Sequence, residues 1–293
     1  MNWDDLRIFL AVARAGQILG AAKRLGLNHA TVSRRVAALE EDLHARLFHR
    51  LTTGMTLTPA GEAFQSVAER MENEIIAARA DLESEGDEIT GTVRIGAPDG
   101  FGVAFLAARL GELTRRHPGL AIQLVPVPRS FSLSRREADI AITVERPEEG
   151  RLVAAKLVDY SLGLYASKQY VAEHGSPANA AELESHPLVG YVEDLVMSRT
   201  LDYAGEFLPG WTSSFSVSSA LGQVEAVRSG AGIGILHTFI ARTLPDLVAV
   251  EAARPIRRAY WLVYHESVRP LRRIQVVSAF IGEIVERDRA IFV

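Results

Sequence analysis

The stretch "AAKRLGLNHATVSRRVAALEEDLHARLF" (Ala21–Phe48) decides how the first part of the chain folds. It predicts a short helix over roughly Ile18–Leu25 that ends at Gly26, because a residue without Cβ suits a helix C-terminus. After the turn, Asn28 can cap a further helix whose apolar residues share one face, namely Val32, Val36, Leu39 and Leu43. An earlier helix is indicated by the spacing of Leu6, Phe9, Leu10 and Ala13. Two short helices around a glycine-containing turn predict a helix-turn-helix.

The other side chains of the later helix suit contact with double-stranded DNA. They are small, polar or basic, and comprise Asn28, His29, Ala30, Thr31, Ser33, Arg34 and Arg35. Small side chains near the helix start let the backbone approach base edges, and the two arginines can meet phosphates or guanine. The alternative for Arg34 and Arg35 is that they only keep the outer face of the helix solvated. For His29, a residue that merely flanks the cap is as good an interpretation as a DNA contact.

Together with the following "HRLTTGMTLTPAGEAF" (His49–Phe64), this stretch resembles the N-terminal winged helix-turn-helix of LysR-type transcriptional regulators. The resemblance implies a wing flanked by Leu47-Phe48 and Leu57-Thr58, with Arg50 reaching toward the DNA backbone or the minor groove. It also implies a protein that is a regulator and not an enzyme.

The chain departs from the family pattern at two places. His29 stands where the family usually has Gln, with Asn28 at about the position of a Ser, and the wing near Thr53 and Gly54 lacks the Arg that relatives commonly carry. Fewer phosphate contacts weaken binding and flatten its dependence on salt. We therefore expect a single arm to bind DNA weakly and paired arms to be required.

Length and composition exclude several other classes of protein. The 293 residues exceed one ordinary core, so two or three domains are expected. The absence of Cys excludes a disulfide scaffold, a zinc–thiolate site and a catalytic thiol. Asp4, Asp5 and Arg7 interrupt any signal peptide, and the longest uncharged run is too polar to span a membrane. We expect a cytoplasmic protein with no membrane partner.

The net charge of −4 conceals a gradient along the chain. Residues 1–65 contain 8 basic and 6 acidic residues, residues 66–90 contain 2 and 8, and the remainder contains 22 and 22. Only the first zone is basic, which agrees with DNA contact there, and the acidity belongs to the second zone. Three zones indicate three structural parts.

The second zone predicts one long helix that pairs two protomers. Thr58 is a suitable N-cap and Pro59 a suitable first helical residue, and no further Pro occurs before Pro98. Apolar residues alternate at spacings of four and three, as in a coiled-coil seam: Phe64, Ala68, Met71, Ile75, Ala78 and Leu82, with Ile89 in phase after a break at Glu85. The alternative is an amphipathic helix packed on its own chain. The resemblance implies a homodimer through this helix, and usually a homotetramer.

The third zone predicts two α/β lobes. Strand-like runs such as "TVRIGAP" (Thr92–Pro98), "LAIQLVPV" (Leu120–Val127) and "ADIAITV" (Ala138–Val144) alternate with helical patterns, which predicts βαβ units and a largely parallel sheet. "LVAAKLV" (Leu152–Val158) and "SLGLYAS" (Ser161–Ser167) are predicted as separate strands, the second opening another series. This zone is similar to the effector-binding domain of LysR-type regulators, itself like a periplasmic binding protein.

The expected fold is thus an α+β multidomain chain. Residues 1–58 form the winged helix-turn-helix DNA-binding domain, 59–90 the linker (dimerisation) helix, and 91–293 the two-lobed α/β effector-binding domain. Lobe I covers about 91–160 and 266–293, and lobe II about 161–265.

A small-molecule effector is expected between the lobes, near strand ends and helix starts. The resemblance implies that this cleft is lined by Pro98, Asp99, Gly100, Phe101, Arg129, Ser130, Thr143, Ser198, Arg199, Ser218 and Ser219. Free N–H groups and Ser hydroxyls at helix starts favour a small anionic metabolite, although each Ser also fits an ordinary N-cap and Asp99 also fits a partner for an amine.

No catalytic, metal or cofactor site is predicted. The "GAGIG" run (Gly230–Gly234) follows a helix and opens a strand, the reverse of a dinucleotide-binding loop, and neither HExxH nor GxSxG occurs. The sequence therefore predicts an effector-responsive LysR-type transcriptional regulator. A small-molecule-binding module, or a small-acid enzyme, with a helical appendage is the alternative.

Overall fold

The computed structural model describes residues 3–51, 54–83, 88–126, 138–147, 151–195 and 203–293. The chain divides into two compact units. The first consists of Met1–Asp87 with the short segments Ser134–Glu137 and Ser267–Arg272, and we call Met1–Asp87 the N-terminal unit. The second, the C-terminal unit, is built from Glu88–Leu133, Ala138–Glu266 and Arg273–Val293.

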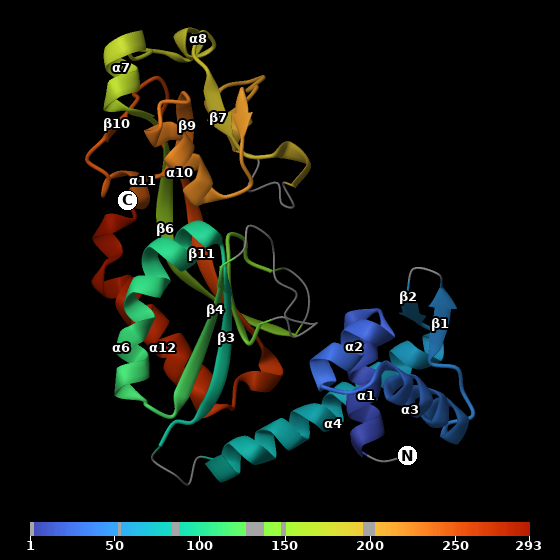
Figure 1. The fold of residues 1–293 in the computed structure, drawn as a ribbon. Coiled ribbons are helices and arrows are strands. Elements are labelled where there is room, and N and C mark those ends of the chain that lie inside the picture. The colour runs from blue at the N-terminus through green and yellow to red at the C-terminus, as the bar shows by residue number, and fades with distance from the viewer. Residues whose placement is uncertain (1–2, 52–53, 84–87, 127–137, 148–150, 196–202) are drawn as a thin grey trace. The chain divides into compact units, whose positions relative to one another are not determined.

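The N-terminal unit is a helical bundle with a small hairpin (Figure 1). Its elements are α1 (Trp3–Ala15), α2 (Ile18–Leu25), α3 (His29–Asp42), β1 (Phe48–Leu51), β2 (Gly54–Leu57) and α4 (Pro59–Glu83). The predicted end of α2 and start of α4 are confirmed: Gly26 ends α2 at φ 64°, and Thr58 Oγ1 accepts the Gly61 N–H at 3.0 Å. These caps are local, so the sequence alone specifies them.

The core of this unit forms around Phe9 of α1. The Phe9 ring lies 5.3 Å from that of Phe48 in β1 and 4.9 Å from that of Phe64 in α4. Val32, Val36 and Leu39 of α3 are buried in the same core, as predicted. One core therefore holds the three-helix bundle, the hairpin and the first turns of α4 together.

A buried carboxylate fixes the entry to the hairpin. Glu40 is only 5% exposed and accepts the backbone N–H groups of Leu47 at 2.8 Å and Phe48 at 3.1 Å. Arg46 lies 3.2 Å from the same carboxylate. Sequence analysis did not single out Glu40, because a Glu near a helix C-terminus resembles any solvated residue.

The frame of the C-terminal unit is one mixed sheet of nine strands within the described residues. Its order is β4-β3-β5-β11-β6-β9-β7-β8, with β10 paired to β6. The strands are β3 (Gly91–Ala97), β4 (Leu120–Pro126), β5 (Ile140–Thr143), β6 (Leu152–Ser167), β7 (Leu188–Gly190), β8 (Phe215–Ser216), β9 (Ile233–His237), β10 (Leu247–Ala249) and β11 (Ile256–His265).

Two sequence predictions about this sheet were wrong. The sheet is not largely parallel, because β6 and β11 pair antiparallel with each other and with their other neighbours. The runs at 152–158 and 161–167 are one continuous strand, β6. The register pair of Tyr160 with Arg258 continues the ladder between them. The two long strands therefore join the first half of the sheet (β4, β3, β5) to the second half (β9, β7, β8).

Helices cover this sheet and connect its strands (Figure 1). They are α5 (Asp99–Phe101), the π-helical turn η1 (Gly102–Leu106), α6 (Ala107–Arg116), α7 (Lys168–His174), α8 (Ala180–Leu183), η2 (Glu193–Leu195), α9 (Ala204–Phe207), α10 (Ala220–Arg228), α11 (Thr238–Ala241), η4 (Glu266–Val268), α12 (Arg272–Arg287) and η5 (Arg289–Ile291). The sequence predicted the helix that begins after Pro98 but not the π-helical turn within it.

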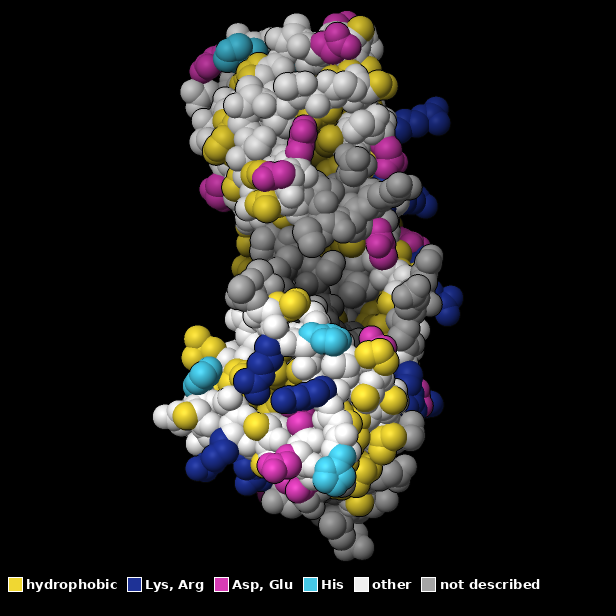
Figure 2. Space-filling model, turned by 90° about the vertical axis from the view of Figure 1, so that its right-hand side faces the viewer, with side chains coloured by type: hydrophobic (Ala, Val, Ile, Leu, Met, Phe, Trp, Pro, Cys, Tyr) yellow, Lys and Arg dark blue, Asp and Glu magenta, His cyan; other side chains and the backbone are white. Residues whose placement is uncertain are grey.

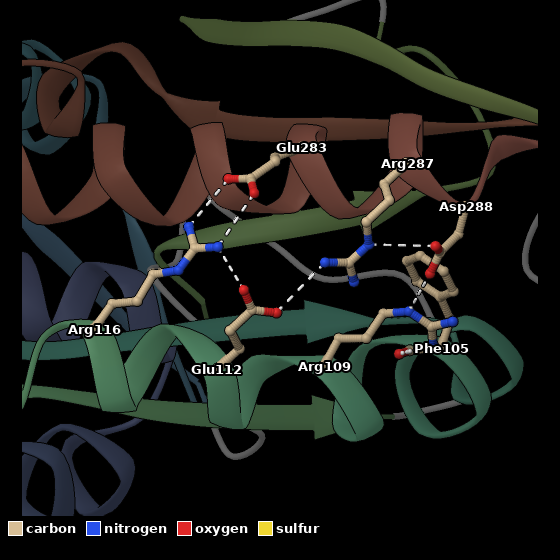
Figure 3. A network of polar contacts seen from close by, with 7 residues as sticks. All are labelled: Phe105, Arg109, Glu112, Arg116, Glu283, Arg287 and Asp288. Atoms are coloured by element: carbon tan, nitrogen blue, oxygen red, sulfur yellow. Dashed lines mark hydrogen bonds and ion pairs between the residues drawn. The ribbon is translucent and has the colours of Figure 1, made fainter.

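Charged side chains connect α6 to α12, which lie side by side (Figure 3). Arg109 Nε lies 2.7 Å from Asp288 Oδ2, and Arg116 lies 3.2 Å from Glu283. Glu112 contacts both Arg116 and Arg287. Because most of these groups are partly exposed, each pair contributes little alone, and the network chiefly fixes the relative position of the two helices.

An aromatic cluster lies beneath these helices. The Phe101 ring packs 5.1 Å from Phe105, 4.5 Å from Tyr260 and 6.0 Å from Phe292, and all four residues are almost fully buried. Phe292 also lies 4.9 Å from Phe239 of α11. The cluster therefore joins the helix after β3, a long strand and residues near position 292. Tyr260 is a fully buried core residue of β11.

Replacing Glu40 by Ala is expected to destabilise the N-terminal unit. Two buried backbone N–H groups would lose their acceptor, which costs about 2–4 kcal/mol in total. Chemical denaturation measures the change, with Glu41→Ala, an exposed neighbour on the same helix, as the matched control. Equal loss of stability in both variants would contradict this role of Glu40.

Candidate functional site

The predicted DNA-binding face begins at the capped end of α3. Asn28 Oδ1 accepts the Ala30 N–H at 2.8 Å, which leaves His29 and Ala30 exposed on the first turn. Thr31 and Ser33 are half-buried beside them. Arg34 is exposed and has no hydrogen bond or ion pair with any residue that the structure describes. The helix therefore presents small polar groups and one unengaged guanidinium.

Arg35, which was also predicted to contact DNA, points to acidic residues of its own chain. Its Nε lies 2.7 Å from Asp5 Oδ1, and its Nη2 lies 3.5 Å from Asp4 Oδ2. Both carboxylates belong to the first turn of α1, where the helix dipole favours negative charge. The Arg35 guanidinium thus joins α3 to α1 and is directed at the chain's own acidic residues. The sequence could not distinguish the two arginines, because the carboxylates that pair with Arg35 lie some thirty residues away.

The wing hairpin is attached to the turn between α1 and α2. The Met55 N–H donates to the Gly16 carbonyl at 2.7 Å, and a Cβ on Gly54 would lie 2.5 Å from that same oxygen. Gly54 also has φ 150°, so both space and backbone conformation require Gly there. Arg50 is exposed on β1, opposite Met55. Thr53 lies outside the described residues.

One face of the N-terminal unit carries both basic and apolar side chains. Figure 2 shows Lys, Arg and His side chains gathered there, with a column of hydrophobic side chains beside them. On α4 the exposed apolar residues are Val67, Met71 and Ile75, spaced four apart. Residues at this spacing lie along one side of a helix.

The structure corrects the start of the predicted dimer seam. Ala68 is 0% exposed and Phe64 is partly buried, and both pack in the core of their own chain. Arg14 of α1 holds this part of α4, at 2.6 Å from Glu72. The first turns of α4 therefore pack on their own chain, as in the alternative to a dimer seam, because they complete the core around Phe9.

The later seam residues differ among themselves. Met71, Ile75 and Ala78 are exposed and remain available to a partner, whereas the side chain of Leu82 lies outside the description. The described part of the helix runs to Glu83, and residues 88–90 are not helical. Ile89 lies beyond it and is 5% exposed, so it belongs to the C-terminal unit.

In the C-terminal unit, a hydrogen bond between Asp99 and Ser219 connects two helices, α5 and α10, that follow strands of different halves of the sheet. Asp99 starts α5 after β3, and Ser219 is the N-cap of α10. Ser219 Oγ donates to Asp99 Oδ2 at 2.6 Å and accepts the Gly222 N–H at 3.1 Å, and the Leu221 N–H points to the same carboxylate oxygen at 3.4 Å. A Cβ on Gly100 would lie 3.3 Å from Ala220, so Gly here permits close approach of α5 and α10.

The other predicted cleft residues are placed unequally. Pro98 and Ser218 are half-buried beside this contact. The Phe101 side chain lies in the aromatic core, and the Thr143 hydroxyl donates to the Glu145 carbonyl at 2.6 Å. The remaining four, Arg129, Ser130, Ser198 and Arg199, lie outside the described residues.

A cavity of about 300 Å³ lies in the second half of the sheet. It is lined by Gly190, Tyr191, Glu193, Tyr203, Ala204, Gly205, Gly210, Trp211, Ser213, Gln223 and Ile235. None of these residues carries a sequence motif that predicts a site. They come from four separate segments, and only the pairing of β7 with β8 and β9 brings them together.

His237 connects this region to the long strands. Its ring stacks on Tyr160 of β6, with ring centroids 5.4 Å apart, and meets Phe239 edge-on. Burial lowers the pKa of His237 to about 4, and the charge of Asp99 opposes that shift only in part. His237 is therefore neutral at pH 7.

The described residues contain no cluster of three or more His, Asp or Glu that could hold a metal ion. None of the described helices has both the length and the apolar character needed to cross a bilayer.

Both units match known families. Residues 3–62 match the family described as bacterial regulatory helix-turn-helix protein, lysR family, and residues 86–286 match the LysR substrate binding domain. The chain is 30% identical over 242 residues to the HTH-type transcriptional regulator CrgA of Neisseria meningitidis serogroup C, covering 82% of this chain and 80% of that protein. It is 28% identical over 269 residues to PtxR of Pseudomonas aeruginosa, covering 87% and 80%.

Solved structures show the same fold. The structure of CrgA from Neisseria meningitidis matches with a TM-score of 0.60 and 25% identity, over 97% of this chain and 98% of that one. A full-length variant of OxyR from Pseudomonas aeruginosa matches with a TM-score of 0.71 and 19% identity, over 97% and 95%.

The buried ring of His237 predicts a loss of stability in acid. The unfolded chain binds this proton near pH 6.5 and the folded chain only near pH 4, so the stabilisation is complete above pH 6.5 and falls as the pH drops toward 4. The loss over that window is at most about 3 kcal/mol. Denaturation of wild type and His237→Gln at about pH 7 and pH 5 measures it. The variant is expected to lose less stability between the two pH values, and an unchanged difference would exclude His237 as the cause.

Proposed function

The chain belongs to the LysR family of transcriptional regulators, and on that basis we propose how its parts divide the work of regulation. Regulators of this family bind DNA and small-molecule effectors and are not enzymes. In this proposal residues 1–58 bind operator DNA, residues 59–90 link and pair protomers, and residues 91–293 sense an effector in the cytoplasm.

The observation that carries the DNA-binding proposal is the exposed start of α3. Its cap leaves His29 and Ala30 uncovered, and Arg34 has no partner among the described residues. These groups, with Asn28, Thr31, Ser33 and the wing residue Arg50, are the proposed contacts with bases and phosphates. Arg35 acts indirectly, because its ion pairs set the position of α3 against α1.

We propose a homodimer through α4, and a tetramer built from two such dimers. The contact surface is the exposed stripe of Val67, Met71 and Ile75, continued by Ala78. Three large apolar side chains on one side of a helix lose contact with water when a second copy covers them. A two-fold dimer would present two α3 helices to two half-sites, which compensates for the weak binding of one arm.

The C-terminal unit is the proposed sensor, with the two halves of its sheet acting as lobes. The residues proposed at the effector cleft are Pro98, Asp99, Gly100, Ser218 and Ser219. An effector that binds better to one arrangement of the lobes shifts the population toward it and alters how the arms meet DNA. The sequence favoured an anionic effector, but the Ser219 hydroxyl and the Leu221 N–H already bind the Asp99 carboxylate.

Arg34→Ala is expected to weaken DNA binding without unfolding the protein. Loss of one base or phosphate contact lowers affinity by about tenfold to a hundredfold, and loss of a phosphate contact also lowers the salt slope by about one. Gel shifts on the chain's own upstream region measure this, with Arg115→Ala, an exposed arginine of the C-terminal unit, as the matched control. Arg35→Ala is expected to cost about 1 kcal/mol of stability instead. If wild type and Arg34→Ala bind that DNA equally poorly at low salt, the proposed function is wrong.

A Met71→Glu, Ile75→Glu double variant is expected to be monomeric and to bind DNA weakly. Both side chains are exposed in the single chain, so its fold tolerates charge, whereas an apolar interface does not. Light scattering measures the mass and gel shifts measure the binding. Val103→Glu, an equally exposed apolar residue of η1, is the control. A double variant that keeps the wild-type mass would place the interface elsewhere.

A further inference from the structure

The N-terminus of α10 already holds a carboxylate of the chain itself. Asp99 Oδ2 receives the Ser219 hydroxyl at 2.6 Å and the Leu221 N–H at 3.4 Å. The start of a helix attracts anions because its first N–H groups lack partners and the helix dipole is positive there. Asp99 thus takes the place that the carboxylate of a ligand would need at this helix.

The cavity in the second half of the sheet suits a planar ring. Tyr191, Tyr203 and Trp211 line it, and the Trp211 indole N–H is engaged by Ser213 Oγ at 2.9 Å. Gln223 lines it from α10 and is 3% exposed. A volume of about 300 Å³ is at the lower end for ligand sites, which limits the ligand to about one ring with a substituent.

The charged side chain that lines this cavity is acidic. Among the lining residues that the structure describes, Glu193 is the one ionisable carboxylate and there is no Lys or Arg. The negative charge of Asp99 also acts there, because it contributes, after burial, to raising the pKa of Tyr191. Burial, with the charges of Tyr191 and Asp99, raises the pKa of Tyr203 to about 12, and the positive charge of Arg258 opposes this rise only in part. Both phenols therefore keep their protons at neutral pH.

We propose that this cavity binds an uncharged small molecule with one planar ring, and that Asp99 excludes carboxylate ligands from it. The inference rests on the proposed role of the C-terminal unit as a sensor and names the chemical class that it senses. A ligand carboxylate would be repelled by Glu193 in the lining and by the charge of Asp99, which acts on the lining residue Tyr191, and the described lining residues include no Lys or Arg. An amide or hydroxyl group on the ring would meet neutral hydrogen-bonding groups instead.

Titration calorimetry of the full chain with benzamide and benzoate tests the proposal, because the two probes share shape and differ in charge. Wild type is expected to bind benzamide at least about tenfold more tightly. Asp99→Asn keeps an acceptor for Ser219 and removes the charge, so the preference is expected to shrink by about tenfold. Asp159→Asn removes a half-exposed carboxylate of β6, one paired with Lys156, and is expected to leave the preference unchanged.

Three results would overturn the inference: tighter binding of benzoate by wild type, an equal preference in wild type and Asp99→Asn, or no heat from either probe at about 10 mM, a concentration that detects even millimolar affinity. Glu193→Gln provides a second test should Asp99→Asn fail to fold, because Glu193 is exposed and the preference is expected to shrink there too. Gel shifts on the same wild-type preparation separate the two claims. Retained DNA binding with any of the three results refutes only the ligand class, whereas loss of DNA binding refutes the proposed function.

Discussion

The antiparallel ladder between β6 and β11 is the interaction on which the C-terminal unit depends. It runs from Ile256 opposite Leu162 to His265 opposite Leu152. Of the two long strands, only β11 pairs with β5, and only β6 pairs with β9 and β10, so each half of the sheet is attached through these two strands. At their middle the Tyr160 and Tyr260 rings stack 4.1 Å apart, beside a register shift. Such an irregularity bends a strand and increases its local twist, here at the place where the two halves of the sheet join.

Sequence predicted the features that depend on neighbouring residues. Gly26, Asn28 and Thr58 set helix ends through their own backbone or a hydrogen bond three residues away or less, and a single sequence displays such signals directly. Contacts between distant segments were missed. Glu40, the ion pair of Arg35 with Asp5, and the bond from Ser219 to Asp99 each join residues whose proximity only the fold creates.

The same limit explains the mixed result for α4. A four-and-three spacing reports that a helix has an apolar side, but not which molecule covers it. Here the early turns cover the chain's own core, as the full burial of Ala68 shows, while Val67 and Met71 on an adjacent strip stay exposed. One helix thus contributes to two different surfaces. Because its first turns pack in the same core as α3, the exposed strip of α4 has a defined position relative to α3.

Phe292 has a consequence for how the protein is made. Its buried ring contacts Phe101, Phe105 and Phe239, and its carbonyl accepts the Ser161 N–H at 2.9 Å. A ribosome delivers these partners long before it delivers residue 292. Until that residue has left the exit tunnel, the cluster has an open apolar gap, so the C-terminal unit completes its core only after translation has passed this point. The nascent chain meanwhile holds a folded helical bundle ahead of an unfinished sheet.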